Sequence, residues 1–271
     1  MKSTTPLVFW CLVGCGPEHG NHADDGGPGL GTAAQTPGGG TTGPPSPLDG
    51  PNLSTDGSSE QCVLLFGETD RIVGSDDFLP FDARPRTVQA WIRTNDPFSD
   101  QIIAGYGRGA AGRGFLIGVD NGRAWVSVAG STRVIGSTDV ADDEWHHIAG
   151  GWDGDQSAIM VDGLVEGNGN FAGDTIAGNF TVGNSPESGV EFLPFIGWVD
   201  DVKVFDIARD PAEVAADSDG ILSPEHLVLH WDFEVGPDAS GIGVVVEDSS
   251  VNNNVGIAAG VSGHPQFPAC R

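Results

Sequence analysis

The sequence predicts an all-β fold: a two-sheet antiparallel sandwich that follows a disordered linker. Two observations lead to this prediction. From Cys62 onward, short apolar segments alternate with Gly, Asp and Asn turns about every eight to twelve residues, as in sandwiches and barrels. The chain also contains 42 Gly and 18 Pro, so turns are plentiful and strands should be short. Residues 61–271 are expected to make one sandwich domain of ordinary size.

Alternating side chains define the expected strands. Within residues 87–93, Val88, Ala90 and Ile92 fall on one face. Residues 114–119 and 123–129 are expected to form a hairpin, because the intervening Asp-Asn-Gly favours a tight turn. Further strands are expected at 145–152, 157–161 and 195–205, the last with a bend at Gly197.

One short helix is expected at residues 210–216. Asp210 is a typical N-cap residue, and Pro211 suits the first helical position. A single helix among many strands does not change the predicted fold class.

The first fifteen residues predict export. Lys2 is followed by an apolar run, residues 6–13, which is too short to cross a hydrocarbon core of about 30 Å. Residues 12–15, Leu-Val-Gly-Cys, resemble the bacterial lipobox. That resemblance implies a signal peptide at 1–14, acylation of Cys15, and an exported, membrane-anchored lipoprotein of the cell envelope or surface. The alternative is an ordinary signal peptide with a chance cysteine.

Residues 15–60 predict a disordered linker. This segment is rich in Gly, Pro and Ser and nearly devoid of large apolar side chains, so burial cannot offset the entropy of ordering it. Such a composition gives a flexible to semi-stiff tether. Its expected role is to hold the domain away from the membrane.

The charge of the chain excludes one class of partner. Its formal net charge is −26 at pH 7, whereas nucleic-acid binding requires clustered Lys and Arg. The same charge disfavours adsorption to an anionic membrane. Membrane contact is therefore expected through the lipid anchor alone.

Four segments in consistent order resemble a known family. They are TVQAWIRT, DDEWHHIAGGWDGDQSAIMVDG, FIGWVDDVKVFDIARDPAEV and HWDFEVG…VEDSSVNNNVG. Together they resemble the laminin-G-like, concanavalin-A-like jelly-roll domains of bacterial exported proteins. The last segment often opens such a domain, but here it ends the chain. Either it completes the same sandwich, which we favour, or it begins a second, truncated copy.

Cys62 and Cys270 are expected to form a disulfide. Both lie in the exported part of the chain, and an oxidising compartment allows such a bond to persist. The alternative is two unpaired thiols.

The predicted function is non-catalytic binding or adhesion. The partner would be a glycan or an envelope protein, contacted through rim loops at 95–100, 105–114 and 184–191, because loops on a stiff scaffold carry binding sites. The aromatic platforms nearest these loops are Phe98, Tyr106 and Phe192. Most of the tryptophans lie within strand patterns and are expected in the core: Trp91, Trp125, Trp145, Trp152, Trp198 and Trp231.

The alternative function is a glycoside hydrolase or lyase of the same fold with atypical catalytic residues. Relatives that cleave β-glucans carry an acidic run of the form Glu-x-Asp-x-(x)-Glu. Glu68 and Asp70 begin such a run, but Ile72 and Val73 stand where the second Glu should be. Glu187 and Glu191 are expected on a loop. His146 and His147 are adjacent on a strand and point to opposite faces, so structural roles are expected for both.

The family resemblance also implies a possible Ca²⁺ ion near the rim of the sandwich. Calcium takes six to eight oxygen ligands, which loops supply best. The alternative is that these strand-end and turn residues cap their own backbone. The candidate ligands are Asp232, Glu234, Asp248, Asn252 and Asp201.

Overall fold

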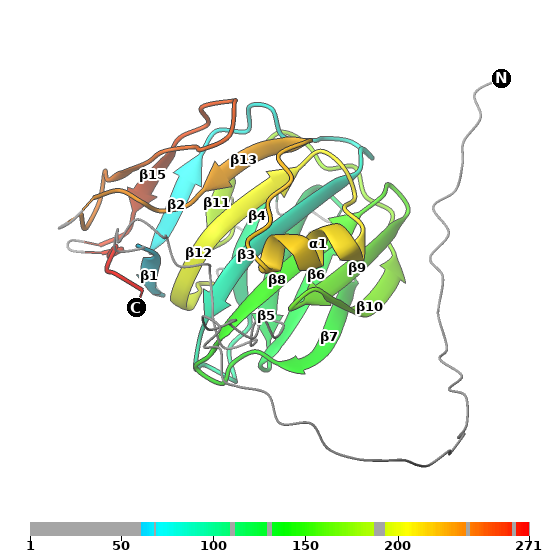
Figure 1. Ribbon diagram of the computed structural model, residues 1–271, viewed down its shortest axis with the longest axis horizontal. Coiled ribbons are helices and arrows are strands. Elements are labelled where there is room, and N and C mark those ends of the chain that lie inside the picture. Colours follow the sequence, from blue (N-terminus) through cyan, green and yellow to red (C-terminus); the bar gives the residue numbers. More distant parts are fainter. Residues whose placement is uncertain are drawn as a thin grey trace, which may run out of the picture. The chain divides into compact units, whose positions relative to one another are not determined.

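The computed structural model describes residues 61–67, 69–108, 112–128, 132–186, 193–236, 239–261 and 264–270 (Figure 1). The predicted signal peptide, Cys15, the linker and Phe192 lie outside these residues. The described strands form two antiparallel sheets, which confirms the predicted sandwich.

The first sheet has seven strands. Its long strand β12 pairs with β3 along most of its length, with β1 at residues 196–199 and with β13 at residues 202–205. The strands, in order across the sheet, are β1 (Val63–Phe66), β12 (Ile196–Phe205), β3 (Arg86–Arg93), β8 (Trp145–Trp152), β9 (Gln156–Val161) and β10 (Leu164–Asn170), with β13 (Leu227–Trp231) beside β12.

The second sheet has eight strands. It begins with elements from the end of the chain and finishes with the consecutive strands of a meander, visible in Figure 1 as β4 to β7. The strands, in order across the sheet, are β14 (Val245–Val246), β15 (Gly256–Ala259), β2 (Arg71–Gly74), β11 (Phe180–Val182), β4 (Gln101–Gly107), β5 (Gly114–Asp120), β6 (Arg123–Val128) and β7 (Arg133–Asp139).

The core lies between the inner faces of the two sheets. Val88, Ala90 and Ile92 of β3 are all fully buried there, as their alternation predicts. The sheets approach closely at Gly150 of β8, where an added Cβ would lie 2.4 Å from Ile117 Cγ2 on the opposite sheet. Each fully buried aliphatic or aromatic side chain stabilises the fold by roughly 1.5–3 kcal/mol.

Turn residues act where the sequence places them, with one exception. The hairpin between β5 and β6 turns at Asn121 and Gly122, both at positive φ (49° and 71°), as a tight antiparallel turn requires. Gly197 also has positive φ, but its neighbours keep their register with β1. The register shift in β12 against β3 lies instead between Asp200 and Lys203.

The C-terminal segment completes the sandwich. β13 pairs with β12 in the first sheet, and β15 pairs with β2 in the second. Gln61 bridges to Ala269, so the two ends of the domain meet. The alternative of a second, truncated copy is therefore wrong.

The predicted disulfide is confirmed. Cys62 and Cys270 are bonded, with their Cα atoms 5.7 Å apart. The bridge packs against Trp91, Trp145 and Trp198 on the outer face of the first sheet. It therefore covers a secondary apolar cluster, separate from the main core, and joins the two ends of the domain.

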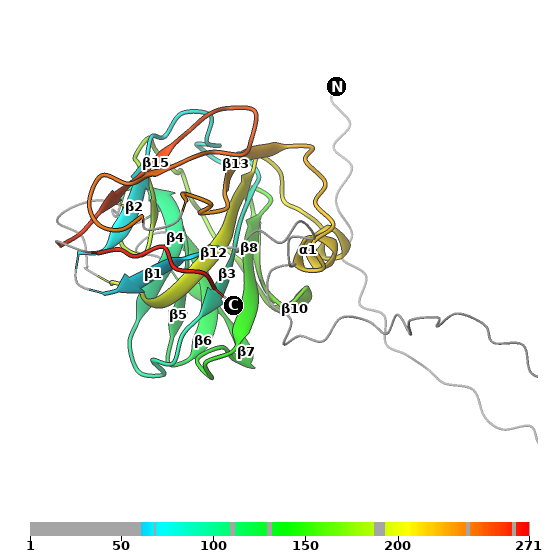
Figure 2. The ribbon, with the colours of Figure 1, turned by 60° about the vertical axis from the view of Figure 1, so that its left-hand side comes forward.

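The predicted helix is α1 (Pro211–Ser218). Asp210 accepts a hydrogen bond from the backbone of Glu213, whose side chain accepts one from the backbone of Asp210, so the N-terminus has a full capping box. Figure 2 shows α1 outside the first sheet, away from the core. In the part of the chain that the structure describes, no helix is long and apolar enough to cross a membrane.

Candidate functional site

The loop between β3 and β4 holds one predicted platform, Phe98, in solvent. The Asp96 carboxylate accepts hydrogen bonds from the backbone N–H groups of Phe98 and Ser99, at 3.0 and 3.2 Å. Burial disfavours the charged form of Asp96, but the hydrogen bonds from Ser99 and Phe98 outweigh it and lower its pKa. The loop is thus fixed by its own side chain, and Phe98 is left 84% exposed.

Beside this loop, an arginine lies on a tryptophan on the outer face of the second sheet. The Arg133 guanidinium carbon is 4.1 Å from the ring centroid of Trp125, a close cation–π contact. Trp125 lies opposite Gly118, where an added Cβ would be 2.3 Å from the indole ring. The glycine therefore allows the ring to lie flat on β5, and only 1% of Trp125 is exposed.

Two carboxylates fix the guanidinium over the ring. Arg133 Nη2 is 2.7 Å from Asp100 Oδ2, and Nη1 is 3.4 Å from Asp120 Oδ2. Asp100 ends the loop that carries Phe98, and Asp120 ends β5. All three side chains are about one quarter exposed, so the outer edge of the arrangement is open to solvent. We call Phe98, Asp100, Asp120, Trp125 and Arg133 the Arg133 cluster.

Two polar atoms of this cluster have unused hydrogen-bonding capacity. Asp100 Oδ1 and Trp125 Nε1 are buried, and neither has a hydrogen-bond partner among the described residues. Buried polar atoms normally have partners, in protein or in bound solvent and ligand. One atom needs a donor and the other an acceptor, and a hydroxyl group can serve as both.

The prediction for Tyr106 is corrected. β4 extends from Gln101 to Gly107, so Tyr106 lies in a strand of the core and not in a rim loop, and its side chain is 0% exposed. Its hydroxyl accepts a hydrogen bond from Arg86 at 3.1 Å and donates one to the carbonyl of Pro80 at 2.8 Å. Burial raises its pKa, against the opposing effect of Arg86. Tyr106 is a core residue and cannot contact a ligand.

The two adjacent histidines have different side-chain surroundings, as expected for neighbouring residues on a strand. His146 lies 2.9 Å from Asp162 and 3.3 Å from Asp142 through its two ring nitrogens. His147 is 1% exposed and packs against Trp91, with a centroid separation of 5.4 Å. Burial lowers the pKa of His147 to about 4, so its ring is neutral at physiological pH.

The residues proposed as calcium ligands do not fit a shared site. Asp248 accepts hydrogen bonds from the backbone of His230, Ser250 and Asn254, and so anchors its own loop. Asp201 is paired with Lys203 and His230, whose donors oppose a cation there.

The other three candidates are also engaged within the protein. Asp232 accepts from the Ser249 hydroxyl, Glu234 accepts from the backbone of Gln61, and the Asn252 amide donates to the carbonyl of Val228. No group of three or more His, Cys, Asp or Glu side chains in the described ranges is placed to hold a metal ion.

Of the candidate catalytic acids, the structure describes Asp70, whose Oδ2 lies 3.5 Å from His264 Nδ1. Asp70 is 1% exposed, and its Oδ2 accepts from the backbone of Phe66 at 3.1 Å, as a loop anchor does. Glu68, Glu187 and Glu191 lie outside the described residues. The hydrolase alternative thus stays a prediction without a described acid pair.

Sequence comparison defines the class of protein. Residues 66–215, more than half of the chain, match the family model of the concanavalin A-like lectin/glucanases superfamily. The chain belongs to this family, as its four segments predict. No curated protein sequence matches the chain.

Solved structures share the fold at low sequence identity. A candidate carbohydrate-binding protein from Bacteroides ovatus has a TM-score of 0.61 and 16% identity, covering 78% of this chain. This chain spans 60% of the length of that protein. A heptameric SAP-like pentraxin from Limulus polyphemus gives 0.47 and 14%, covering 78% of this chain and 92% of the pentraxin. The CBM40 module of a Ruminococcus gnavus sialidase gives 0.47 and 16%, covering 60% of this chain and all of that module.

The sequence predicts part of the Arg133 cluster, namely Phe98 and the loop that ends at Asp100, but not Arg133 or Asp120. Trp125 is buried, as the sequence predicts, but it belongs to a smaller apolar cluster on the outer face of the second sheet. The available signal was the hairpin register, which places Gly118 opposite Trp125 on the outer face. A tryptophan opposite a glycine on a sheet surface indicates a flat ring that another group can cover.

Proposed function

We propose that this domain is a non-catalytic module that binds a glycan at the Arg133 cluster. The observation that carries the proposal is the fixed guanidinium of Arg133, held on Trp125 by two carboxylates, one of which ends the loop that exposes Phe98. An envelope protein is the second class of partner that the sequence predicts, but the cluster favours a glycan.

The arrangement supplies the groups that sugar recognition requires. Phe98 offers an apolar face for a sugar ring, while Arg133, Asp100 and Asp120 offer donors and acceptors for hydroxyls. Ion pairs within the protein already fix Arg133, Asp100 and Asp120, so these three side chains lose little conformational entropy on binding. The Bacteroides ovatus protein is described as a candidate carbohydrate-binding protein, which agrees with this proposal, but the likeness by itself shows only the fold.

The test compares two exposed phenylalanines. Phe98 lies in the loop that follows β3. Phe78, which is 61% exposed, lies in the loop that precedes β3 and therefore at the opposite end of that strand. On a glycan array, Phe98→Ala should weaken binding about tenfold or more, as truncation of a contact side chain does. Phe78→Ala, the matched control, should bind like the unchanged domain.

Arg133→Ala is a second, independent test and should also abolish most glycan binding. Its control is Arg113→Ala, which removes an exposed arginine paired with Asp174 and should leave glycan binding unchanged. Binding that survives both Phe98→Ala and Arg133→Ala would place the site elsewhere. Release of new reducing ends from a bound glycan would instead favour the hydrolase alternative.

We also propose that the protein is an envelope lipoprotein anchored through Cys15. The support is the sequence of residues 1–15, which carries an apolar run and a lipobox-like Leu-Val-Gly-Cys. Cells grown with a radioactive fatty acid should label the mature protein, and Cys15→Ser should remove the label. An unlabelled mature protein would contradict the anchor and leave the ordinary signal peptide.

A further inference from the structure

We propose that the Arg133 cluster selects uncharged glycans and discriminates against acidic ones such as sialylated or uronate-containing chains. This inference rests on the proposed function, because it concerns the ligand class of the same site. It does not depend on which sugar is bound.

The local charge of the cluster opposes an acidic ligand. One guanidinium faces two carboxylates, so Asp100, Asp120 and Arg133 together carry a net charge of −1. An acidic sugar would normally be recognised by a free arginine through paired hydrogen bonds. Here both terminal nitrogens of Arg133 already bind carboxylates, so a ligand carboxylate would meet like charges instead.

Neighbouring charged groups do not reverse this balance. Asp96 lies in the same loop as Phe98 and is held in its charged form by the hydrogen bonds that lower its pKa. Arg123 and Asp139 are register partners at the end of the β6–β7 pair and offset each other. The chain as a whole carries −26, so the long-range field also opposes an anionic ligand.

The cluster also has unused hydrogen-bonding capacity. Asp100 Oδ1 requires a donor, which a hydroxyl supplies and an ionised carboxylate does not. Trp125 Nε1, on a side chain that is 1% exposed, requires an acceptor, which a hydroxyl oxygen also supplies. Hydroxyl groups can therefore satisfy both atoms, whereas an ionised carboxylate can satisfy only Trp125 Nε1.

The experiment measures binding of the full mature protein to pairs of glycans in which one member is neutral and the other carries carboxylates. Suitable pairs are lactose with sialyllactose, galactan with polygalacturonate, and glucose with glucuronate oligomers, each immobilised at equal density. At least one neutral member should bind, and its acidic partner should bind about tenfold more weakly. The ratio of the affinity for the neutral member to the affinity for the acidic member should shrink at 1 M salt, where the screening length falls to about 3 Å.

Asp120→Asn separates local charge from the field of the whole chain. It brings the cluster from −1 to zero while keeping Asp100 and Arg133, so the preference for the neutral member should narrow several-fold. Asp174→Asn, which removes a carboxylate beside Arg113, is the control and should leave the ratio unchanged. Circular dichroism of both variants checks the fold.

The outcomes separate this inference from the proposed function. Equal or tighter binding of the acidic members, lost in Phe98→Ala, would overturn the selectivity and leave the glycan site in place. Binding to no glycan in either set would overturn the proposed function itself. An unchanged ratio in Asp120→Asn would show that the cluster charge does not set the preference, and would also overturn this inference.

Discussion

Replacing Cys62 and Cys270 by Ala should lower the free energy of unfolding by about 5 kcal/mol. The bond joins residues 208 positions apart, so it removes a large amount of conformational freedom from the unfolded chain. In the folded domain it also packs against Trp91, Trp145 and Trp198, and Cys62 is fully buried. Denaturant titration of the domain, followed by circular dichroism, measures the change.

The wild-type domain titrated with and without a reductant is the control. Reduction should reproduce the loss seen in the variant, because both open the same loop. A loss below about 1 kcal/mol in both cases would contradict the role assigned to the bond, and would mean that the ends stay together in the unfolded chain. Such residual structure is a known reason why disulfides deliver less than loop entropy predicts.

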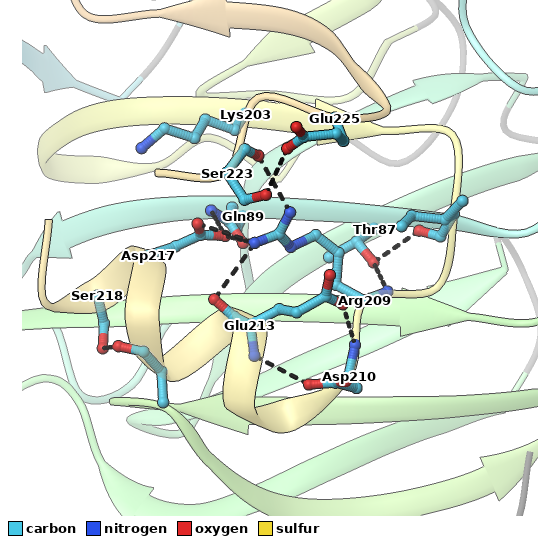
Figure 3. Close-up of polar contacts among 12 residues, drawn as sticks. Thr87, Gln89, Lys203, Arg209, Asp210, Glu213, Asp217, Ser218, Ser223 and Glu225 are labelled. Carbon is cyan, nitrogen blue, oxygen red and sulfur yellow. Dashed lines mark hydrogen bonds and ion pairs between the residues drawn. The ribbon is translucent and has the colours of Figure 1, made fainter. Parts of the chain in front are cut away.

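Removing one partner of the buried Arg209–Asp217 pair should be almost as damaging. Figure 3 shows Arg209 between the start of α1 and Asp217 near its end. The two side chains are 2.9 Å apart and only 1% and 0% exposed. Asp217 also accepts a hydrogen bond from Gln89 of β3 at 3.0 Å, and Arg209 lies 4.2 Å over the ring of Phe205. The pair thus fastens α1 to the outer face of the first sheet.

Asp217→Ala should therefore cost about 3–5 kcal/mol, since it leaves a buried guanidinium without its carboxylate. Burial raises the pKa of Asp217 in spite of Gln89 and Arg209, which shows how strongly the site disfavours an isolated charge. The matched control is the double variant Arg209→Met with Asp217→Leu, which removes both charges and should recover most of the loss. Thermal and denaturant unfolding of the wild-type protein, Asp217→Ala and the double variant measure the three free energies of unfolding. A double variant no more stable than Asp217→Ala would contradict this explanation.

Alternation and turn chemistry predict the fold well where strands are long. Residues 145–152 were predicted as a strand and form β8 with those bounds, and the Asn121-Gly122 hairpin forms where expected. Strand β4 was missed because Gly105 and Gly107 read as turn residues. Gly105 is instead required by packing, since an added Cβ would lie 2.4 Å from the carbonyl of Phe115 on the next strand.

The same mistake displaced Tyr106 from the core to a rim loop. A lone tyrosine between two glycines resembles an exposed platform in sequence, but its hydroxyl is satisfied by Arg86 and Pro80 inside the sandwich. Arg133 was missed for a different reason. Its partners Asp100 and Asp120 come from a separate loop and strand, and no local pattern reveals that three such positions meet on one face.

Nuclear magnetic resonance of the tryptophan indole groups tests the proposed site most directly. The chain has seven tryptophans, and the Trp125 Nε1–H group beside Arg133 is buried with no hydrogen-bond partner in the described part of the chain. Titration with a neutral glycan that binds on the array should shift the Trp125 indole resonance, assigned by Trp125→Phe, more than those of Trp91, Trp152 and Trp231. A glycan that binds tightly while the Trp125 signal stays in place would contradict the Arg133 cluster as the binding site.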